Sequence, residues 1–502
     1  MHTYEPPIFE LSGAGKIGAW LPETGVPETA LPADLLRTDD LAGLPELSET
    51  EVVRHFTRIS QRNFCIDTGM YPLGSCTMKY NPKIHEDAAR MPGFAFIHPL
   101  QEDTSVQGAL RLTYDLQALL AEISGFDQVC LQPAAGAQGE FAGILVFRAY
   151  HLDRGDDQRD EVLCPNSAHG TNPATAAMVG FKVVEIATDP RGNVDLADLR
   201  AKVGPRTAGL MLTNPNTLGL FDENVHEVAA IVHDAGGLMY GDGANFNAIL
   251  GIVRPGDVGF DFMHYNLHKT FTTPHGGGGP GCGAVGCKTF LAPYLPGPIV
   301  VENDDQYSSF TPEKSIGRLK TFKGNFGMFV RAYTYIRMLG AAGLREISEN
   351  AVLNANYLRV KLHDLYPVAY DRTCMHEVVL QGKLKGAPDI HTLDIAKRLI
   401  DFGFHPPTVY FPISVAESIM IEPTETESKR NLDAFIAAMR QIAREAVESP
   451  ELLHNAPTTA PVRRLDEVGA ARKPILKYDR AAINGLRGDK ATTDDQLEQP
   501  TY

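Results

Sequence analysis

The chain has 502 residues, 43% of them hydrophobic and 22% charged, proportions typical of a globular protein with roughly two to four domains. Its net charge of −16 argues against a nucleic-acid or anionic-membrane surface. It contains no apolar run long enough to span a membrane, no secretory pattern at its N-terminus and no C-x-x-C pair among its seven cysteines. We therefore expect a cytoplasmic protein with reduced thiols and no membrane association.

Residues 1–100 are interrupted by proline and glycine and show little periodicity, so we interpret them as an N-terminal arm. One amphipathic helix is predicted from Glu46 to Ile59. Ser48, followed three residues later by Glu51, has the spacing of a capping box at the start of that helix. An irregular arm of this kind lies across another subunit or across the main domain.

Residues 101–330 alternate between short β-rich runs and helical stretches. This alternation predicts a large α/β domain with a mostly parallel, doubly wound sheet. In such sheets a ligand binds outside the carboxyl ends of the strands. The predicted strands are 128–132, 161–164, 182–186, 208–213, 238–244, 260–265 and 283–286, and the predicted helices are 110–124, 139–152 and 224–234.

Residues 331–484 are predicted to form a small C-terminal α/β domain, and residues 485–502 are predicted to form a polar tail. The predicted helices of this domain are 328–365, 392–402 and 431–448, and its predicted strands are 376–380 and 418–421.

Lys269 follows an apolar, strand-like run and precedes four consecutive glycines. An ammonium ion is disfavoured at the end of a buried strand, so we expect an uncharged, nucleophilic amine that condenses with an aldehyde. Asp242 stands at the carboxyl end of the preceding predicted strand. The pair predicts a site for pyridoxal 5'-phosphate (PLP), in which Lys269 holds the aldehyde and Asp242 pairs with the pyridinium nitrogen.

The turn at Ala135, Gly136 and Ala137 connects the first predicted strand to a helix. Small residues there allow backbone N–H groups and a helix N-terminus to approach the cofactor phosphate closely. Tight packing is the alternative explanation for small residues at such a junction. The position of the turn at the first strand–helix connection favours phosphate binding.

Three further residues are candidates for contact with the cofactor. His169 follows a predicted strand and could stack on the pyridine ring. A lone loop histidine is more often only hydrogen-bonded, but the lysine and aspartate at neighbouring strand ends favour stacking here. Ala244 would share a side of the strand with Asp242 and pack on the opposite ring face. His268 could reach the phosphate. The spacing of His264 and His268 would suit a metal only on a helix, so no metal site is predicted.

Five stretches of the chain carry a family resemblance. They are 72–82 (PLGSCTMKYNP), 132–140 (QPAAGAQGE), 167–174 (SAHGTNPA), 266–271 (NLHKTF) and 420–429 (MIEPTETESK). On these stretches the chain resembles the P protein of the glycine cleavage system, the glycine dehydrogenase (decarboxylating) family, from about residue 8 to about residue 477. That family occurs as one long chain or as two subunits, and this length is similar to subunit 2.

The resemblance implies a type I PLP-dependent transferase fold, with Lys269 carrying the cofactor, His169 stacked on the ring and Asp242 at the ring nitrogen. It also implies decarboxylation of glycine, release of CO2 and transfer of the aminomethyl group to the lipoyl arm of the H protein. The expected partners are subunit 1, in a heterotetramer with two copies of each subunit, and the lipoylated H protein.

Other functions stay open on the residues alone. An aminotransferase would need an arginine in the small domain to bind a second carboxylate, and a cysteine desulfurase would need a mobile cysteine, for which Cys374 is the only small-domain candidate. A non-catalytic subunit that binds the H protein is a third possibility. Ser75, Cys76 and Lys79 could grip the glycine carboxylate or could form a domain-packing loop, and Glu422 and Glu425 are left unassigned.

Overall fold

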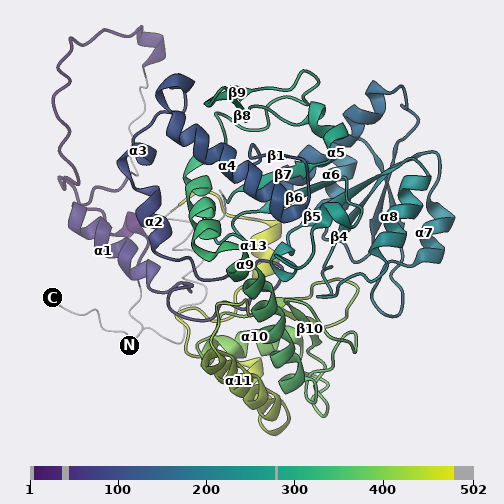
Figure 1. Ribbon diagram of the computed structural model, residues 1–502. Helices are drawn as coiled ribbons and strands as arrows, with labels where there is room; N and C mark the ends of the chain where they lie inside the picture. Colours follow the sequence, from purple (N-terminus) through teal and green to yellow (C-terminus); the bar gives the residue numbers. More distant parts are fainter. Residues whose placement is uncertain (1–4, 37–43, 277–280, 480–502) are drawn as a thin grey trace, which may run out of the picture.

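A computed structural model describes residues 5–36, 44–276 and 281–479. Its largest unit is a seven-stranded sheet with the strand order β1-β7-β6-β5-β4-β2-β3 (Figure 1). Neighbouring strands are parallel except at β7, which is antiparallel to both β1 and β6. The predicted α/β class and the mostly parallel sheet are therefore confirmed. The strands are β1 (Gln128–Cys130), β2 (Glu161–Pro165), β3 (Lys182–Ile186), β4 (Thr207–Thr213), β5 (Leu238–Gly243), β6 (Phe262–Asn266) and β7 (Gly283–Cys287).

Helices cover both faces of this sheet, because successive side chains of each strand point to opposite faces. Tyr240 and Phe262 join the apolar cluster that includes α5, whereas Met239 and Met263 join the cluster that includes α4, α8 and α9. Both faces are therefore buried, as expected for parallel strands that are apolar along their whole length. The helices of this part are α4 (Gln107–Ser124), α5 (Gly136–Asp153), α6 (Thr171–Val179), α7 (Leu196–Lys202) and α8 (Val225–Asp234).

The register of β5 and β6 positions the predicted site. The two strands are parallel neighbours, and Asp242 is paired with His264. Both strands end at the same edge of the sheet, so the turn after β6 lies beside the end of β5. This edge is where ligands bind in open α/β sheets.

A smaller antiparallel sheet with the order β10-β12-β11 lies in the C-terminal part. It connects to the large sheet through α9 (Phe326–Leu362), which leaves helical geometry at Gly340, where φ is 61°. The predicted domain boundary near residue 330 falls inside α9 and stays a prediction, and the predicted tail 485–502 lies outside the described residues. The elements of this part are β10 (Val378–Gln381), β11 (Thr408–Val409), β12 (Ser418–Ile421), α10 (Thr392–Asp401), α11 (Lys429–Glu448), α12 (Glu451–His454) and α13 (Glu467–Arg472).

The N-terminal arm contains α1 (Glu49–Ser60), and the predicted capping box of Ser48 and Glu51 is present. Ahead of α1 the chain extends away from the rest of the molecule (Figure 1). After α1 it returns, and Leu73 forms an antiparallel bridge with Ile421 of β12. The arm thus reaches the small sheet. The remaining elements are α2 (Ile84–Ala89), α3 (Pro92–Ala95), the hairpin β8 (Ile299–Asn303) and β9 (Gln306–Phe310), and 3₁₀ helices at Ile8–Glu10, Ala33–Leu35, Asp103–Ser105, Phe246–Ala248, Pro255–Asp257 and Thr289–Tyr294.

In the described part of the chain, no helix combines the length and the apolar character needed to cross a membrane.

Candidate active site

Lys269 lies in the turn that follows β6, where its backbone N–H donates to Asn266. Its side chain is half-buried, and Nζ donates a hydrogen bond of 2.6 Å to the backbone oxygen of Ser75 in the arm. The sequence predicted the position of Lys269 at the end of a buried strand. The contact with the arm was not predicted, because it joins residues 194 positions apart.

Asp242 is buried at the end of β5, with 4% of its surface exposed. Its Oδ1 accepts from the backbone N–H of Ala244 at 2.9 Å, and its Oδ2 accepts from Asn172 Nδ2 at 3.0 Å. Burial acts to raise the pKa of Asp242, but His264, these two donors and the charge of Lys269 outweigh it and leave the pKa lowered. The carboxylate is therefore ionised at neutral pH and lies within the electrostatic reach of Lys269.

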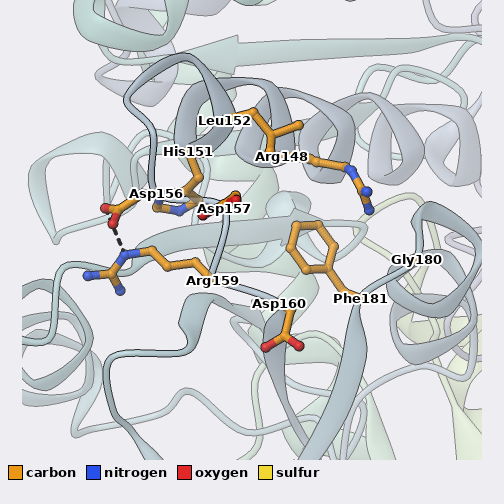
Figure 2. A pocket seen from close by; sticks show the side chains of 9 residues that line it. All are labelled: Arg148, His151, Leu152, Asp156, Asp157, Arg159, Asp160, Gly180 and Phe181. Atoms are coloured by element: carbon orange, nitrogen blue, oxygen red, sulfur yellow. Dashed lines mark hydrogen bonds and ion pairs between the residues drawn. The ribbon is translucent and has the colours of Figure 1, made fainter.

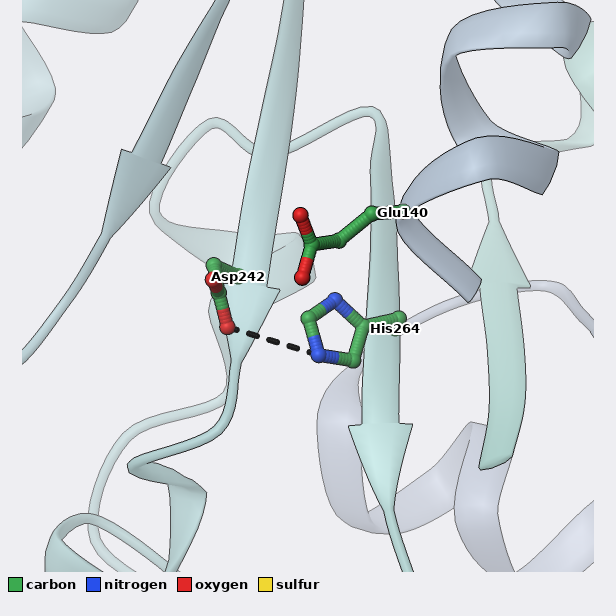
Figure 3. Close-up of side chains that lie close together, drawn as sticks. All are labelled: Glu140, Asp242 and His264. Atoms are coloured by element: carbon green, nitrogen blue, oxygen red, sulfur yellow. Dashed lines mark ion pairs between the residues drawn. The ribbon is translucent and has the colours of Figure 1, made fainter. Parts of the chain in front are cut away.

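Figure 3 shows a second carboxyl group, Glu140 of α5, beside Asp242 and His264. His264 Nε2 lies 3.4 Å from Asp242 Oδ1, and polar atoms of all three residues lie within 4.8 Å of one another. Burial and then the charge of Asp242 raise the pKa of Glu140 to about 8. Glu140 is thus predominantly protonated at neutral pH, and the cluster keeps one carboxylate rather than two.

Glu140 also connects Asp242 to the segment that follows His169. Its Oε1 accepts from Thr171 Oγ1 at 2.9 Å and its Oε2 from Asn172 Nδ2 at 3.0 Å. Sequence reasoning missed Glu140 and Asn172 as site residues, although both stand inside the quoted motifs. The signal that could have found Glu140 is a carboxylate on the first turns of an otherwise apolar, buried helix.

His169 is half-buried in the loop after β2, and its Nδ1 lies 2.8 Å from Thr171 Oγ1. Burial lowers the pKa of His169, which favours the neutral imidazole at neutral pH. Its ring meets that of Phe411 edge-on, at a centroid separation of 5.4 Å. Ala244 lies just past the end of β5, so strand alternation does not fix its direction as predicted, and its N–H supports Asp242 instead.

The predicted phosphate turn forms the start of α5, with Ala135 as N-cap, Gly136 as first residue and Ala137 exposed. A Cβ atom at Gly136 would lie 2.6 Å from Asn266 Nδ2, so only glycine allows this close approach to the end of β6. The first N–H groups of a helix have no partner within it and favour an anion. His268 lies near this turn but is engaged with Cys282, whose N–H is 3.1 Å from Nδ1.

These features test whether the site fits PLP. The amine of Lys269 would take the aldehyde, the ionised Asp242 retains acceptor positions for a ring N–H, and the start of α5 offers N–H groups to a phosphate. Beside that helix start, Nδ2 of Asn266 is a further amide N–H donor. The residues present therefore fit the cofactor.

Lys79 is buried, and its Nζ donates to Thr270 O at 2.8 Å and to Glu425 Oε1 at 2.7 Å. The ammonium thus ties the arm both to the Lys269 turn and to the segment after β12. This engagement favours the domain-packing interpretation of Lys79 over a grip on the glycine carboxylate.

A separate hollow of about 80 Å³ lies near the C-terminal end of α5 (Figure 2). It is lined by residues such as Arg148, His151 and Phe181, and Asp156 closes one side through an ion pair with Arg159. None of the predicted site residues lines it. The hollow is thus distinct from the cluster at the strand ends.

Comparisons with known proteins agree with this geometry. The sequence profile of class-V aminotransferases matches residues 144–309, and that of the glycine dehydrogenase C-terminal domain matches residues 347–458. A crystal structure of the glycine decarboxylase P-protein in inhibitor-bound form superposes with a TM-score of 0.70 at 22% identity, over 82% of this chain and 93% of that chain. A cysteine desulfurase from Thermococcus onnurineus gives 0.59 at 17% identity, over 75% and 95%. At these low sequence identities, the two structural matches support only the fold.

The fold and the match to the class-V aminotransferase profile define a PLP-dependent enzyme of the α/β class. Curated relatives narrow this class. Proteins named as probable glycine dehydrogenase (decarboxylating) subunit 2 are 58% identical in Bacillus velezensis, over 96% of this chain and 98% of the relative, and 60% identical in Exiguobacterium sibiricum, over 94% and 96%. The chain belongs to the glycine dehydrogenase (decarboxylating) subunit 2 family.

Proposed function

We propose that this chain is the PLP-carrying subunit of a glycine-cleaving enzyme, which decarboxylates glycine and passes the aminomethyl group to the lipoyl arm of an H protein. The observation that carries the proposal is that Lys269 lies at the same edge of the sheet as the buried, ionised Asp242 and within its electrostatic reach. It occurs in a chain that is 58% identical to a glycine dehydrogenase subunit over nearly its whole length.

PLP, when bound, supplies an electron sink for the pair left behind when the glycine carboxylate departs as CO2. Lys269 would hold the cofactor aldehyde and accept a proton when an incoming amine displaces it. Asp242 would hold the proton on the ring nitrogen through a charge-assisted hydrogen bond worth about 1.5–3 kcal/mol. The protonated Glu140 keeps a second negative charge away from the same ring.

His169 is proposed to stack on the cofactor ring, supported by its position in the loop after β2 and by its neutral imidazole. Ala135, Gly136 and Ala137 would hold the phosphate through the start of α5, and His268 would border that region. Ala244 would support Asp242 through its backbone N–H.

Subunit 1 is the proposed partner, in a heterotetramer of two copies of each subunit, with the H protein as the acceptor of the aminomethyl group. The arm supports a partner subunit, because the side chains of Trp20, Leu21 and Val26 are between 72% and 89% exposed in the isolated chain. Contiguous exposed apolar side chains mark protein interaction sites. The cytoplasmic location stays a prediction.

The desulfurase alternative requires an accessible cysteine on a mobile loop. Cys374 is buried, and burial raises the pKa of its thiol to about 12. A neutral, enclosed thiol is a poor nucleophile. The structure therefore disfavours this alternative.

The test is exchange of labelled bicarbonate into the carboxyl group of glycine, with purified chain, PLP, subunit 1 and lipoylated H protein. We expect exchange in the wild type and none with Lys269→Ala. The visible absorbance of the bound cofactor, erased by borohydride in the wild type and absent in Lys269→Ala, checks cofactor attachment separately. Cofactor absorbance without exchange would contradict the proposed glycine cleavage and would still support PLP binding.

A further inference from the structure

The arm makes a strained turn directly beside Lys269. Ser75 and Thr77 have φ angles of 67° and 47°, a left-handed conformation that non-glycine residues adopt only where their surroundings impose it. The turn directs the Ser75 carbonyl at Lys269 Nζ, 2.6 Å away.

Two buried carboxyl groups from the C-terminal part hold this turn from both sides. Ser75 N–H donates to Glu377 Oε2 at 2.9 Å, and Thr77 N–H donates to Glu422 Oε2 at 3.0 Å. Glu377 directly precedes β10 and Glu422 directly follows β12, two antiparallel neighbours of the small sheet. The turn beside the reactive lysine is therefore shaped by the small sheet and not by the arm alone.

His376 completes a closed polar cluster with these carboxyl groups. All three residues are 0% exposed, and His376 Nε2 lies 3.8 Å from Glu377 Oε2 and 4.0 Å from Glu422 Oε1. Within the described structure neither ring nitrogen of His376 has a hydrogen-bond partner. A histidine enclosed in this way does not neutralise the carboxyl groups, since burial lowers its pKa to about 3.

The charge state of the two carboxyl groups is linked to Lys269. Burial raises the pKa of both groups, and the neighbouring Glu422 further raises that of Glu377, which lies well above its ordinary value. The charge of Lys269 opposes this rise at both. Lys269 and the two carboxyl groups therefore interact electrostatically as well as through the turn.

We propose that Glu377 and Glu422 are positioning residues for Lys269, which fix the Ser75 carbonyl as the resting place of the lysine amine, with Glu422 supplying the negative charge of the pair. The inference rests on the proposed function, in which an incoming amine displaces Lys269 from the cofactor. A displaced lysine that docks at a fixed carbonyl stays clear of the substrate and returns to a defined position afterwards. Glu377, held protonated, acts mainly through its hydrogen bond to the turn, and Glu422 acts also through its charge.

Other titratable groups border the same cluster. On the side of the large sheet, the charge of Lys269 interacts with Glu140, His169, Asp242, His264, His268 and His275. On the side of the small sheet, the groups that interact with Glu377, Glu422 or Lys269 are His376, Cys76 and Cys374. Burial keeps both thiols and the imidazole neutral near pH 7, so the two carboxyl groups dominate the response of Lys269 from this side.

The test is the rate at which trace acetic anhydride acetylates Lys269 in the cofactor-free protein, measured by peptide mass spectrometry across a pH series. Glu422→Gln is expected to raise the rate near neutral pH by about three- to tenfold, because the turn no longer holds the Ser75 carbonyl on the amine and a nearby negative charge is lost. Glu377→Gln replaces a neutral acid and should change the rate by less than about twofold. Glu427→Gln is the matched control, because Glu427 lies in the same segment and contacts Asn431 instead.

A second measurement covers the case in which Glu422→Gln fails to fold. In a Glu140→Gln background, which removes the other protonated carboxyl group near Lys269, infrared spectroscopy should show a buried carboxylic acid band. Glu377→Gln should weaken this band and Lys269→Met should strengthen it, since loss of the cation lets the pair take up a proton. Equal acetylation rates in folded Glu422→Gln and Glu427→Gln, or a carboxylic acid band unaffected by Lys269→Met, would overturn the proposal. So would a stoichiometric divalent metal in the purified protein, which would make the cluster a metal site. These measurements need neither glycine nor H protein, so they separate this inference from the proposed function.

Discussion

Asp242 accepts hydrogen bonds from donors that favour its ionised form. In the proposed function, its single negative charge pairs with the protonated ring nitrogen of the cofactor. Asp242→Asn keeps the shape but removes the charge. We expect PLP affinity and bicarbonate exchange to fall by about ten- to a hundredfold, the loss of a charge-assisted hydrogen bond of about 1.5–3 kcal/mol. Absorbance titration with PLP measures the affinity.

The matched control for that substitution is Asp261→Asn. Asp261 is also a buried carboxylate at the same sheet, but it contacts His233 and the backbone of Met239 rather than the site. This variant should lower the melting temperature without changing PLP affinity. If both variants weaken PLP binding equally, Asp242 has no specific role at the ring.

Glu140 gives a pH-dependent stability with a defined sign. Its pKa of about 8 in the folded chain lies above the ordinary 4.5, so the folded protein holds a proton that the unfolded chain releases. The stabilisation is complete below pH 4.5 and is lost as the pH rises through about 8. Glu140→Gln lacks this titration, so calorimetry of the cofactor-free proteins should show the variant gaining stability relative to the wild type as the pH rises through about 8. Parallel melting curves at all pH values would contradict the assignment.

At the scale of elements, the start of α5 depends on the absence of a side chain at Gly136. In Gly136→Ala the new Cβ would meet the Asn266 side chain at 2.6 Å and separate α5 from the end of β6. We expect PLP affinity to fall by at least about tenfold, because charge-assisted hydrogen bonds to the phosphate are lost. Gly108→Ala in α4 is the control, since its Cβ would meet no atom within 4 Å. An unchanged affinity in Gly136→Ala would show that the phosphate binds elsewhere.

The elements of the sheet were predictable where local pattern and tertiary structure agree. Strands β3 and β12 have the predicted bounds. The sequence of β12 is a short apolar run that is wholly buried, whereas β3 is a β-branched run at the sheet edge in which only Ile186 is buried. The hairpin of β8 and β9 was missed, since its second strand (QYSSF) is polar and only half-buried. Helix α6 was also missed, because its Asn-Pro start and small residues carry no 3.6-residue periodicity.

The same reasoning explains which site residues the sequence could predict. Lys269 and Asp242 follow strands, and parallel strand ends must meet at one edge. Glu377 and Glu422 contact residues more than 300 positions away, at Ser75 and Thr77. No local pattern encodes such a contact, so only the folded chain identifies these carboxyl groups.

For the whole molecule, the arm is the feature that the isolated chain leaves unexplained. The part of the arm ahead of α1 exposes large apolar side chains to water, at a cost of about 25 cal/mol for each Å² that a partner would otherwise cover. Trp20 is 85% exposed and Leu21 89% exposed. A surface of this kind is stabilised by association, which agrees with the proposed partner subunit.

The arm therefore yields a prediction for assembly. Trp20→Ser combined with Leu21→Ser should weaken binding to subunit 1 by at least about tenfold, because buried aromatic anchors dominate interface energies. PLP absorbance and the melting temperature of the isolated chain should not change. Ile413→Ser, at a side chain 90% exposed in the C-terminal part, is the control.

Trp20 is the only tryptophan of the chain, so a fluorine label on tryptophan reports the arm alone. Its NMR signal should shift when subunit 1 is added to the wild type, and an unshifted signal in a formed complex would place the interface elsewhere.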